Sequence, residues 1–152
     1  MKIDVVIPNY NGFNLLEKNL PQVLNVMKGY NIGNIIIVDD ASKEEDYNKV
    51  LRLVENLNKQ NKLKITLLRN SKNMGFSSTA NEGVKSSFAQ LVVLLNSDAV
   101  PEKGFLEPVL SDFKNDKELF EVGCMDKSIE KEGVILRGRG VAYFKRGLII
   151  HS

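Results

Sequence analysis

The chain has 152 residues, of which 43% are hydrophobic and 26% are charged, a composition ordinary for one globular domain with a sizeable core. Its formal net charge of +2 is too small to indicate a nucleic-acid-binding protein. A single cysteine, Cys124, excludes an intramolecular disulfide and gives no sign of an oxidising compartment. No apolar stretch approaches the roughly 20 residues of a membrane span, and no signal-peptide pattern opens the chain. We therefore expect a cytoplasmic protein that can also associate peripherally with the inner face of a membrane.

Short apolar runs and helical patterns alternate along the chain. The expected strands, each an apolar run bounded by polar turn residues, are residues 3–7, 35–38, 63–68, 91–95 and 120–125. The expected helices, in which apolar residues recur at helical spacing, are residues 13–27, 42–57, 76–88 and 101–113. Pro21 is expected to divide the first helix, and Ser42 with Glu45 is expected to form a capping box for the second.

This alternation predicts a Rossmann-like, doubly wound α/β fold in three layers, with a mostly parallel sheet. The tail from Lys127 onward differs, because its short strand-like runs are separated by glycines. The chain stops at His151-Ser152, directly after an apolar run, which we interpret as a cut. We therefore expect one domain over residues 1–152, with a short strand-rich tail, that is truncated.

Acidic residues follow two of the expected strands. Asp39-Asp40 follows the second strand, and Asn96-Ser97-Asp98 follows the fourth. Ligands of parallel sheets bind at the carboxyl ends of the strands, so both groups are expected to face one crevice. Asn96 and Asp98 could share a cation that bridges the phosphates of a nucleotide, while Asp39 could accept a hydrogen bond from a base. Ordinary turn and helix-capping roles are the alternative for both groups.

The remaining candidates lie in two loops. After the first strand, Pro8-Asn9-Tyr10-Asn11 lacks the glycine spacing of a dinucleotide or triphosphate loop, but the ring of Tyr10 could stack on a nucleobase. A half-buried loop aromatic is the alternative for Tyr10. Asn73, Gly75 and Asn81 form a second group at a predicted helix start, where a capped helix with a polar face is the alternative. Arg69 and Lys72 could offset phosphate charge, although solvated surface positions are more usual for both residue types.

The order and spacing of these motifs together resemble glycosyltransferase family 2. The resemblance covers about residues 3–110 and rests on four motifs in sequence order: Pro8-Asn9-Tyr10-Asn11, Asp39-Asp40-Ala41-Ser42, Asn73-x-Gly75-Phe76-x4-Asn81-x-Gly83, and Asn96-Ser97-Asp98. It implies the GT-A fold and metal-assisted transfer of a sugar from a nucleotide-diphosphate donor, usually with inversion. The donor would be a UDP-, dTDP- or GDP-sugar and the acceptor a glycan or a lipid-linked molecule, as in polysaccharide biosynthesis, with no nucleic acid involved.

The resemblance also implies roles for individual residues. Residues of the first loop would lie against the base and ribose, and Asp39 would contact the base. Asp98 matches the last position of the family's D-x-D motif, which binds Mn²⁺ or Mg²⁺ through the diphosphate. Asn96 stands where many members have Asp, so the metal affinity would be modest. The full set implied for the nucleotide-sugar site is Pro8, Asn9, Tyr10, Asn11, Asp39, Asn73, Gly75, Asn81, Asn96 and Ser97, with Asp98 for the metal.

An inverting transferase also needs a general base to deprotonate the acceptor hydroxyl. The family's base follows a Gly-Gly-Phe-Asp segment that does not occur before Ser152, so no catalytic residue is assigned and the chain alone is expected to transfer little. A receiver-like signalling module and a nucleotidyltransferase are the alternative functions. A receiver-like signalling module would carry its acidic pair after the first strand, and a nucleotidyltransferase would have a glycine-rich basic loop there; neither pattern occurs.

Overall fold

The computed structural model describes residues 1–130, 133–138, 142–145 and 148–151 of the chain. The chain divides into two compact units, Met1–Lys103 and Gly104–Ser152. The expectation of one domain over the whole chain stays a prediction. No helix of the described residues is both long enough and apolar enough to cross a membrane.

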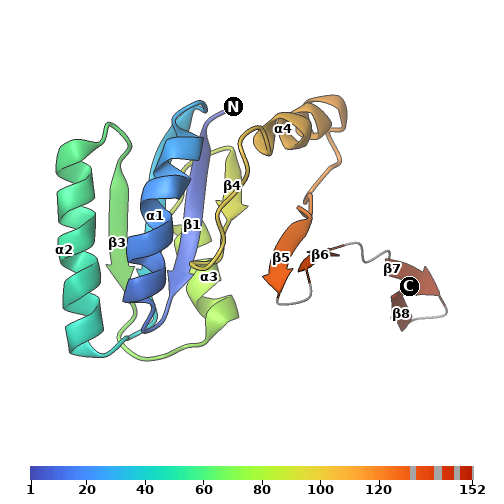
Figure 1. Ribbon diagram of the computed structural model, residues 1–152. Coiled ribbons are helices and arrows are strands. Elements are labelled where there is room, and N and C mark those ends of the chain that lie inside the picture. Colours follow the sequence, from blue (N-terminus) through green and yellow to red (C-terminus); the bar gives the residue numbers. More distant parts are fainter. Residues whose placement is uncertain (131–132, 139–141, 146–147, 152) are drawn as a thin grey trace. The chain divides into compact units, whose positions relative to one another are not determined.

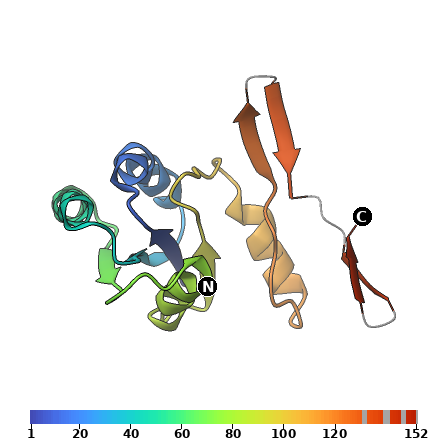
Figure 2. The same cartoon turned by 90° about the horizontal axis from the view of Figure 1, so that it is seen from below.

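The first unit is a three-layer α/β structure. Its four strands are all parallel and lie in the order β3-β2-β1-β4: β1 (Ile3–Asn9), β2 (Ile32–Asp39), β3 (Ile65–Arg69) and β4 (Leu91–Leu94). Helices α1 (Phe13–Met27) and α2 (Glu44–Gln60) cover one face of the sheet, and α3 (Phe76–Lys85) covers the other (Figures 1 and 2). This confirms the predicted fold class.

Each central strand contains a continuous apolar run, Val5–Ile7 in β1 and Ile35–Val38 in β2, because helices cover both faces of the sheet. The side chains of Val5, Val6 and the run from Ile35 to Val38 are inaccessible to solvent. Helix α1 buries the apolar side that its sequence spacing predicts, including Leu16, Leu20 and Met27. Pro21 lies inside this helix and does not divide it, contrary to our expectation. A proline removes only one backbone bond, and the burial of the apolar side of α1 keeps the helix continuous.

β1 and β2 extend further than their apolar runs, as far as Asn9 and Asp39, which pair with each other. Pro8 has no N–H to donate, yet it lies within the central strand β1. The carbonyl of Val6 points towards β4 and accepts from Leu95 N–H, so Pro8, two residues later, points to the same side. β4 pairs with β1 only as far as Val6, and no strand of the sheet therefore requires a donor at Pro8.

The second unit contains helix α4 (Leu106–Asn115) and two antiparallel hairpins, β5 (Asp126–Glu130) with β6 (Gly133–Arg137), and β7 (Ala142–Lys145) with β8 (Leu148–His151). The strand-rich tail is thus confirmed. Two local predictions are wrong. Residues 120–125 form no strand, and α4 begins at Leu106 rather than at Pro101, because Gly104 adopts a positive φ of 90° that interrupts the helix.

Helix α3 packs against the sheet through Gly83. A Cβ atom at this position would lie 2.3 Å from Cγ1 of Val6 and 3.1 Å from Cγ2 of Val38. These valines belong to the buried cluster beneath α3, so the helix could not keep its position if Gly83 carried a side chain.

We expect Gly83→Ala to destabilise the protein by about 1–3 kcal/mol through overpacking, as measured by urea unfolding. Gly29→Ala is the matched control, because a Cβ atom there would meet nothing within 4 Å. Equal stability of the two variants would contradict the close packing of α3 on β1 and β2.

Candidate functional site

The strand order places a topological switch point between β1 and β4. The chain winds from β1 outward to β3 and then returns to the other side of β1 as β4. In such sheets ligands bind in the crevice outside the carboxyl ends of the strands at this point. The loop after β4 is anchored here, because Asn19 Nδ2 of α1 donates to the carbonyl of Ser97 at 3.0 Å.

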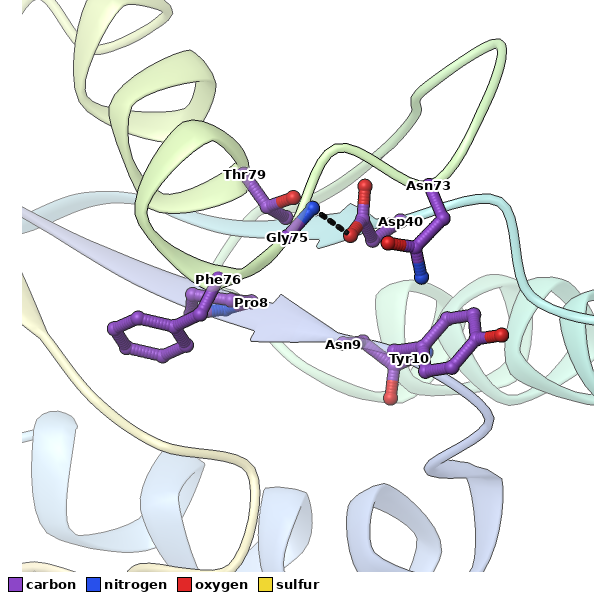
Figure 3. A pocket seen from close by; sticks show the side chains of 8 residues that line it. All are labelled: Pro8, Asn9, Tyr10, Asp40, Asn73, Gly75, Phe76 and Thr79. Carbon is purple, nitrogen blue, oxygen red and sulfur yellow. Dashed lines mark hydrogen bonds between the residues drawn. The ribbon is translucent and has the colours of Figure 1, made fainter.

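A pocket of about 260 Å³ opens at the carboxyl edge of the sheet (Figure 3). Its lining comes from the ends of β1 and β2 and from the start of α3: Pro8, Asn9, Tyr10, Asp40, Asn73, Gly75, Phe76 and Thr79. Its volume lies below the usual range for whole-ligand sites, so it can hold one ring-sized part of a larger molecule. Tyr10 presents its ring there, with 56% of its surface exposed.

Asp39 lies beneath this pocket and does not line it. Its carboxylate is inaccessible to solvent and accepts hydrogen bonds from Asn9 Nδ2 at 3.0 Å and from the N–H of Ser42 at 3.1 Å. Ser42 Oγ donates to the same carboxylate. The Nε atom of Arg69 lies 3.5 Å from Oδ2. Asp39 therefore joins the carboxyl ends of β1, β2 and β3.

Asp40 faces the opposite way and forms part of the pocket wall. Its carboxylate accepts from the N–H groups of Met74 and Gly75 and from Asn70 Nδ2, each at 2.8 Å. Burial alone would raise the pKa of Asp40, but these hydrogen bonds and one with Thr79 outweigh it and hold the pKa below its ordinary value. The ionised side chain thus fixes the loop before α3, where Gly75 has a φ of 80°.

The loops after β1 and β2 are also joined directly. The N–H of Asn11 donates to Ser42 Oγ at 2.8 Å, and Asn11 Oδ1 accepts from the N–H of Lys43 at 2.9 Å. Ser42 is therefore not the cap of α2, contrary to our prediction, because its hydroxyl serves these loops and Lys43 occupies the cap position without a side-chain bond. Since Asn9 and Asn11 are both anchored, Tyr10 between them is held in place at the pocket.

Arg69 braces the same turn. Its guanidinium donates to Glu44 Oε2 at 2.8 Å and to the carbonyl of Ser42 at 2.9 Å, and it stacks on Tyr47 with 4.0 Å to the ring centroid. The hydrogen bond and charge of Glu44 and the charge of Asp39 raise its pKa. The sequence suggested a phosphate contact or a solvated surface. Asp39 and Arg69 each directly follow an expected strand, which was the available sequence signal, and the register of the β2–β3 pair then places them opposite each other.

The candidates of the loop after β4 and of α3 lie outside the pocket. Asn96 and Asp98 are exposed in a turn closed by a 3.1 Å bond from Ala99 N–H to the carbonyl of Asn96. Asn81 is exposed on α3. In the part of the chain that the structure describes, no three His, Cys, Asp or Glu residues are grouped to hold a metal. The carboxylate of Asp98 and the amide oxygen of Asn96 suit a cation whose remaining coordination positions are filled by phosphate oxygens and water, as is usual for Mg²⁺.

Phe76 and Thr79 line the pocket although sequence reasoning assigned neither of them a binding role. Phe76 is 62% exposed at the first position of α3, whereas Thr79 is buried and accepts a hydrogen bond from Asn70 Nδ2. An aromatic residue directly after Gly75, at the predicted start of the helix, was the available signal for Phe76. No sequence pattern distinguished Thr79 from the other small residues of the helix.

Solved structures show the class of fold to which this chain belongs. A mannosyltransferase from Pyrobaculum calidifontis, in complex with GDP-Man and Mn²⁺, has 23% identity and a TM-score of 0.59 over 68% of this chain and 30% of that chain. S. aureus TarS 1-349 in complex with UDP-GlcNAc has 22% identity and a TM-score of 0.60 over 76% and 32%. The fold is that of the GT-A glycosyltransferases.

The sequence comparisons define the family. The chain belongs to glycosyl transferase family 2, whose family model matches residues 4–150. It is similar to a dolichol-phosphate mannosyltransferase of Pyrococcus furiosus, with 26% identity over 78% of this chain and 32% of the relative. It is also similar to a UDP-N-acetylglucosamine–dolichyl-phosphate N-acetylglucosaminyltransferase of Methanococcus voltae, with 29% identity over 83% and 53%. The chain thus spans about a third to a half of these two relatives.

We expect Asp40→Asn to destabilise the protein at neutral pH by about 1–3 kcal/mol, because an amide cannot accept from all the donors that the carboxylate satisfies. Since the pKa of Asp40 is lowered on folding, its stabilisation is present above the unfolded pKa, near 3.8, and is lost as pH falls through the lower folded value. Thermal unfolding at neutral pH and below pH 3.8 should show the gap between wild type and variant closing in acid. A gap independent of pH would contradict an ionised Asp40.

Arg69→Lys should lower the free energy of urea unfolding by about 1–3 kcal/mol, because a lysine cannot contact Glu44, the carbonyl of Ser42 and the Tyr47 ring together. Arg52→Lys is the matched control, since Arg52 is exposed on α2. If both variants lose the same stability, the bracing role of Arg69 is wrong.

Proposed function

We propose that this chain is the donor-binding part of an enzyme that transfers a sugar from a nucleotide-diphosphate donor to an acceptor hydroxyl. Family membership supports glycosyl transfer as the activity. The observation that carries the donor role is the ring-sized pocket at the carboxyl edge, where Tyr10 offers an exposed aromatic face beside the switch point. A receiver-like module and a nucleotidyltransferase find no support in the family match.

The nucleobase would lie in this pocket, stacked on Tyr10, with Asn73 and Gly75 on the opposing loop. Asn73 carries an amide that can both donate to and accept from a base edge. Asp40 forms the wall behind it and stays ionised, so it favours a base that presents an N–H. The contact predicted for Asp39 would then be indirect: its carboxylate has no exposed surface, and it would support the base through Asn9 and through the turn to Asp40.

The diphosphate would extend from the pocket towards the loop after β4. There Asp98, with Asn96 and the backbone at Ser97, would hold a Mn²⁺ or Mg²⁺ ion whose other ligands are phosphate oxygens and water. The Mn²⁺ and GDP-Man of the Pyrobaculum calidifontis enzyme support this pairing of metal and nucleotide. The cation would neutralise charge on the departing diphosphate.

The acceptor would be a glycan or a lipid-linked molecule, which the dolichyl-phosphate substrates in the names of two relatives support. We propose inversion at the anomeric carbon, with the acceptor hydroxyl attacking opposite the leaving group. The general base that this requires would lie in the portion that the longer relatives have in addition, and this chain alone would transfer little sugar.

Isothermal titration of the chain with UDP, dTDP and GDP, with and without Mn²⁺ or Mg²⁺, tests the proposal. We expect one of the three nucleotides to bind, and to bind at least about tenfold more tightly with the cation, a difference of about 1.4 kcal/mol. Asp98→Ala should abolish the metal dependence, while Asp112→Ala, an exposed aspartate on α4, should leave it intact. Binding of none of the three, or binding indifferent to the metal in wild type, would sink the proposal.

A further inference from the structure

We propose that the amino edge of the sheet, opposite the pocket, is a docking surface for an anionic lipid bilayer. Six exposed lysines define this surface, which we call the basic edge: Lys2, Lys28, Lys59, Lys62, Lys64 and Lys85. The inference is independent of the proposed transferase function, because none of these residues lines the pocket.

The topology brings the six lysines to one edge although they are far apart in sequence. In a parallel sheet with helical crossovers, every strand begins, and every helix ends, at the same edge. Lys2 precedes β1, Lys28 follows α1, and Lys85 is the last residue of α3. Lys59 lies in the last turn of α2, and Lys62 and Lys64 lie in the loop between α2 and β3. Figure 1 shows these connections at the upper end of the first unit.

The basic edge is almost free of acidic charge. The segments that form its loops, residues 1–2, 28–31, 61–64 and 86–90, contain no Asp or Glu. Asp4, near the start of β1, is 4% exposed and accepts a hydrogen bond from Ser87 Oγ at 2.7 Å. Of the six lysines, Lys85 forms an ion pair with Glu82, which lies one turn earlier on α3. Some of this charge complements the carboxyl ends of the helices, but Lys2, Lys62 and Lys64 do not lie in helices.

An aromatic side chain accompanies the charge. Phe88 lies in the loop between α3 and β4 with 95% of its surface exposed. A fully exposed phenylalanine among lysines matches the pattern of surfaces that rest on a membrane, where an apolar ring enters the headgroup region while cations contact anionic lipids. Exposure of this apolar ring to water is unfavourable in the isolated chain, and burial in a membrane would remove that cost.

Lipid fits this surface better than nucleic acid does. All six cations are lysines and none is arginine, although the protein uses Arg69 where two planar contacts are needed. Lysine acts as a point charge that suits a diffuse anionic surface, whereas arginine is the residue enriched where phosphates and bases are read bidentately.

Docking by the basic edge would orient the site. β1 has 7 residues, so the pocket at its carboxyl end would lie roughly 23 Å from the membrane-facing edge, at about 3.3 Å per residue. The pocket would therefore open away from the bilayer. An acceptor group that extends well beyond the lipid headgroups would reach this pocket, whereas a group at the level of the headgroups would not.

Co-sedimentation with vesicles tests the inference, using phosphatidylcholine alone and phosphatidylcholine mixed with phosphatidylglycerol. We expect binding only to the anionic vesicles, weakening as salt rises. The triple variant Lys28→Glu, Lys62→Glu, Lys64→Glu should bind them at least roughly 100-fold more weakly, since each lysine near an anionic surface contributes about a fivefold factor and the three factors multiply. Phe88→Ser should reduce the binding that remains at high salt.

The matched control carries the same charge change elsewhere: Lys18→Glu, Lys43→Glu, Lys72→Glu, all at exposed positions away from the basic edge. It should keep most of the vesicle binding, and thermal unfolding should show all variants folded. Equal losses in the two triple variants would overturn the inference, as would equal binding to both kinds of vesicle. Displacement of the protein from anionic vesicles by a low concentration of single-stranded oligonucleotide would overturn it in favour of nucleic acid.

Discussion

Two adjacent carboxylates that point in opposite directions hold the functional edge of this protein together. Successive side chains of an extended strand alternate between the two faces of the sheet, so Asp39 and Asp40 leave the end of β2 on opposite sides. Asp39 contacts the ends of β1 and β3 through a hydrogen bond and an ion pair, and Asp40 accepts hydrogen bonds from the loop that precedes α3. The residues that line the pocket come from the end of β1, which Asp39 contacts, from Asp40 itself, and from the start of α3 with its preceding loop, which Asp40 contacts.

Such an arrangement is stable only if both charges are fully satisfied. A buried carboxylate without partners would cost several kcal/mol, which a small domain cannot tolerate. Here backbone N–H groups and amides supply charge-assisted hydrogen bonds and one guanidinium supplies an ion pair, which together offset the desolvation. The bonds from Asn9, Asn70 and Gly75 connect segments that are 30 to 35 residues apart in sequence. Local polar chemistry therefore maintains a long-range geometry that the apolar core below could not specify by itself.

The sequence was sufficient for the layers of the fold, because buried parallel strands and amphipathic helices carry strong periodic signals. It was less informative at the ends of the elements. Pro8 and Asn9 are of residue types common in turns, yet they complete β1, since pairing with a neighbouring strand overrides local preference. Ser42 has the composition of a helix cap, but a tertiary partner, Asn11, takes its hydroxyl. Which of Asp39 and Asp40 faces the pocket depends on where β2 ends, and no pattern in the sequence reveals that register.

One absent hydrogen atom disfavours closure of the binding crevice. Because the ring of Pro8 replaces the N–H that would point towards β4, the next hydrogen bond that β1 would donate on that side cannot form, and β4 pairs with β1 only as far as Val6. Further backbone pairing between β1 and β4 would therefore lack one of its hydrogen bonds, whatever the neighbouring side chains are. This loss is a covalent property of the chain, so it is present with or without a ligand.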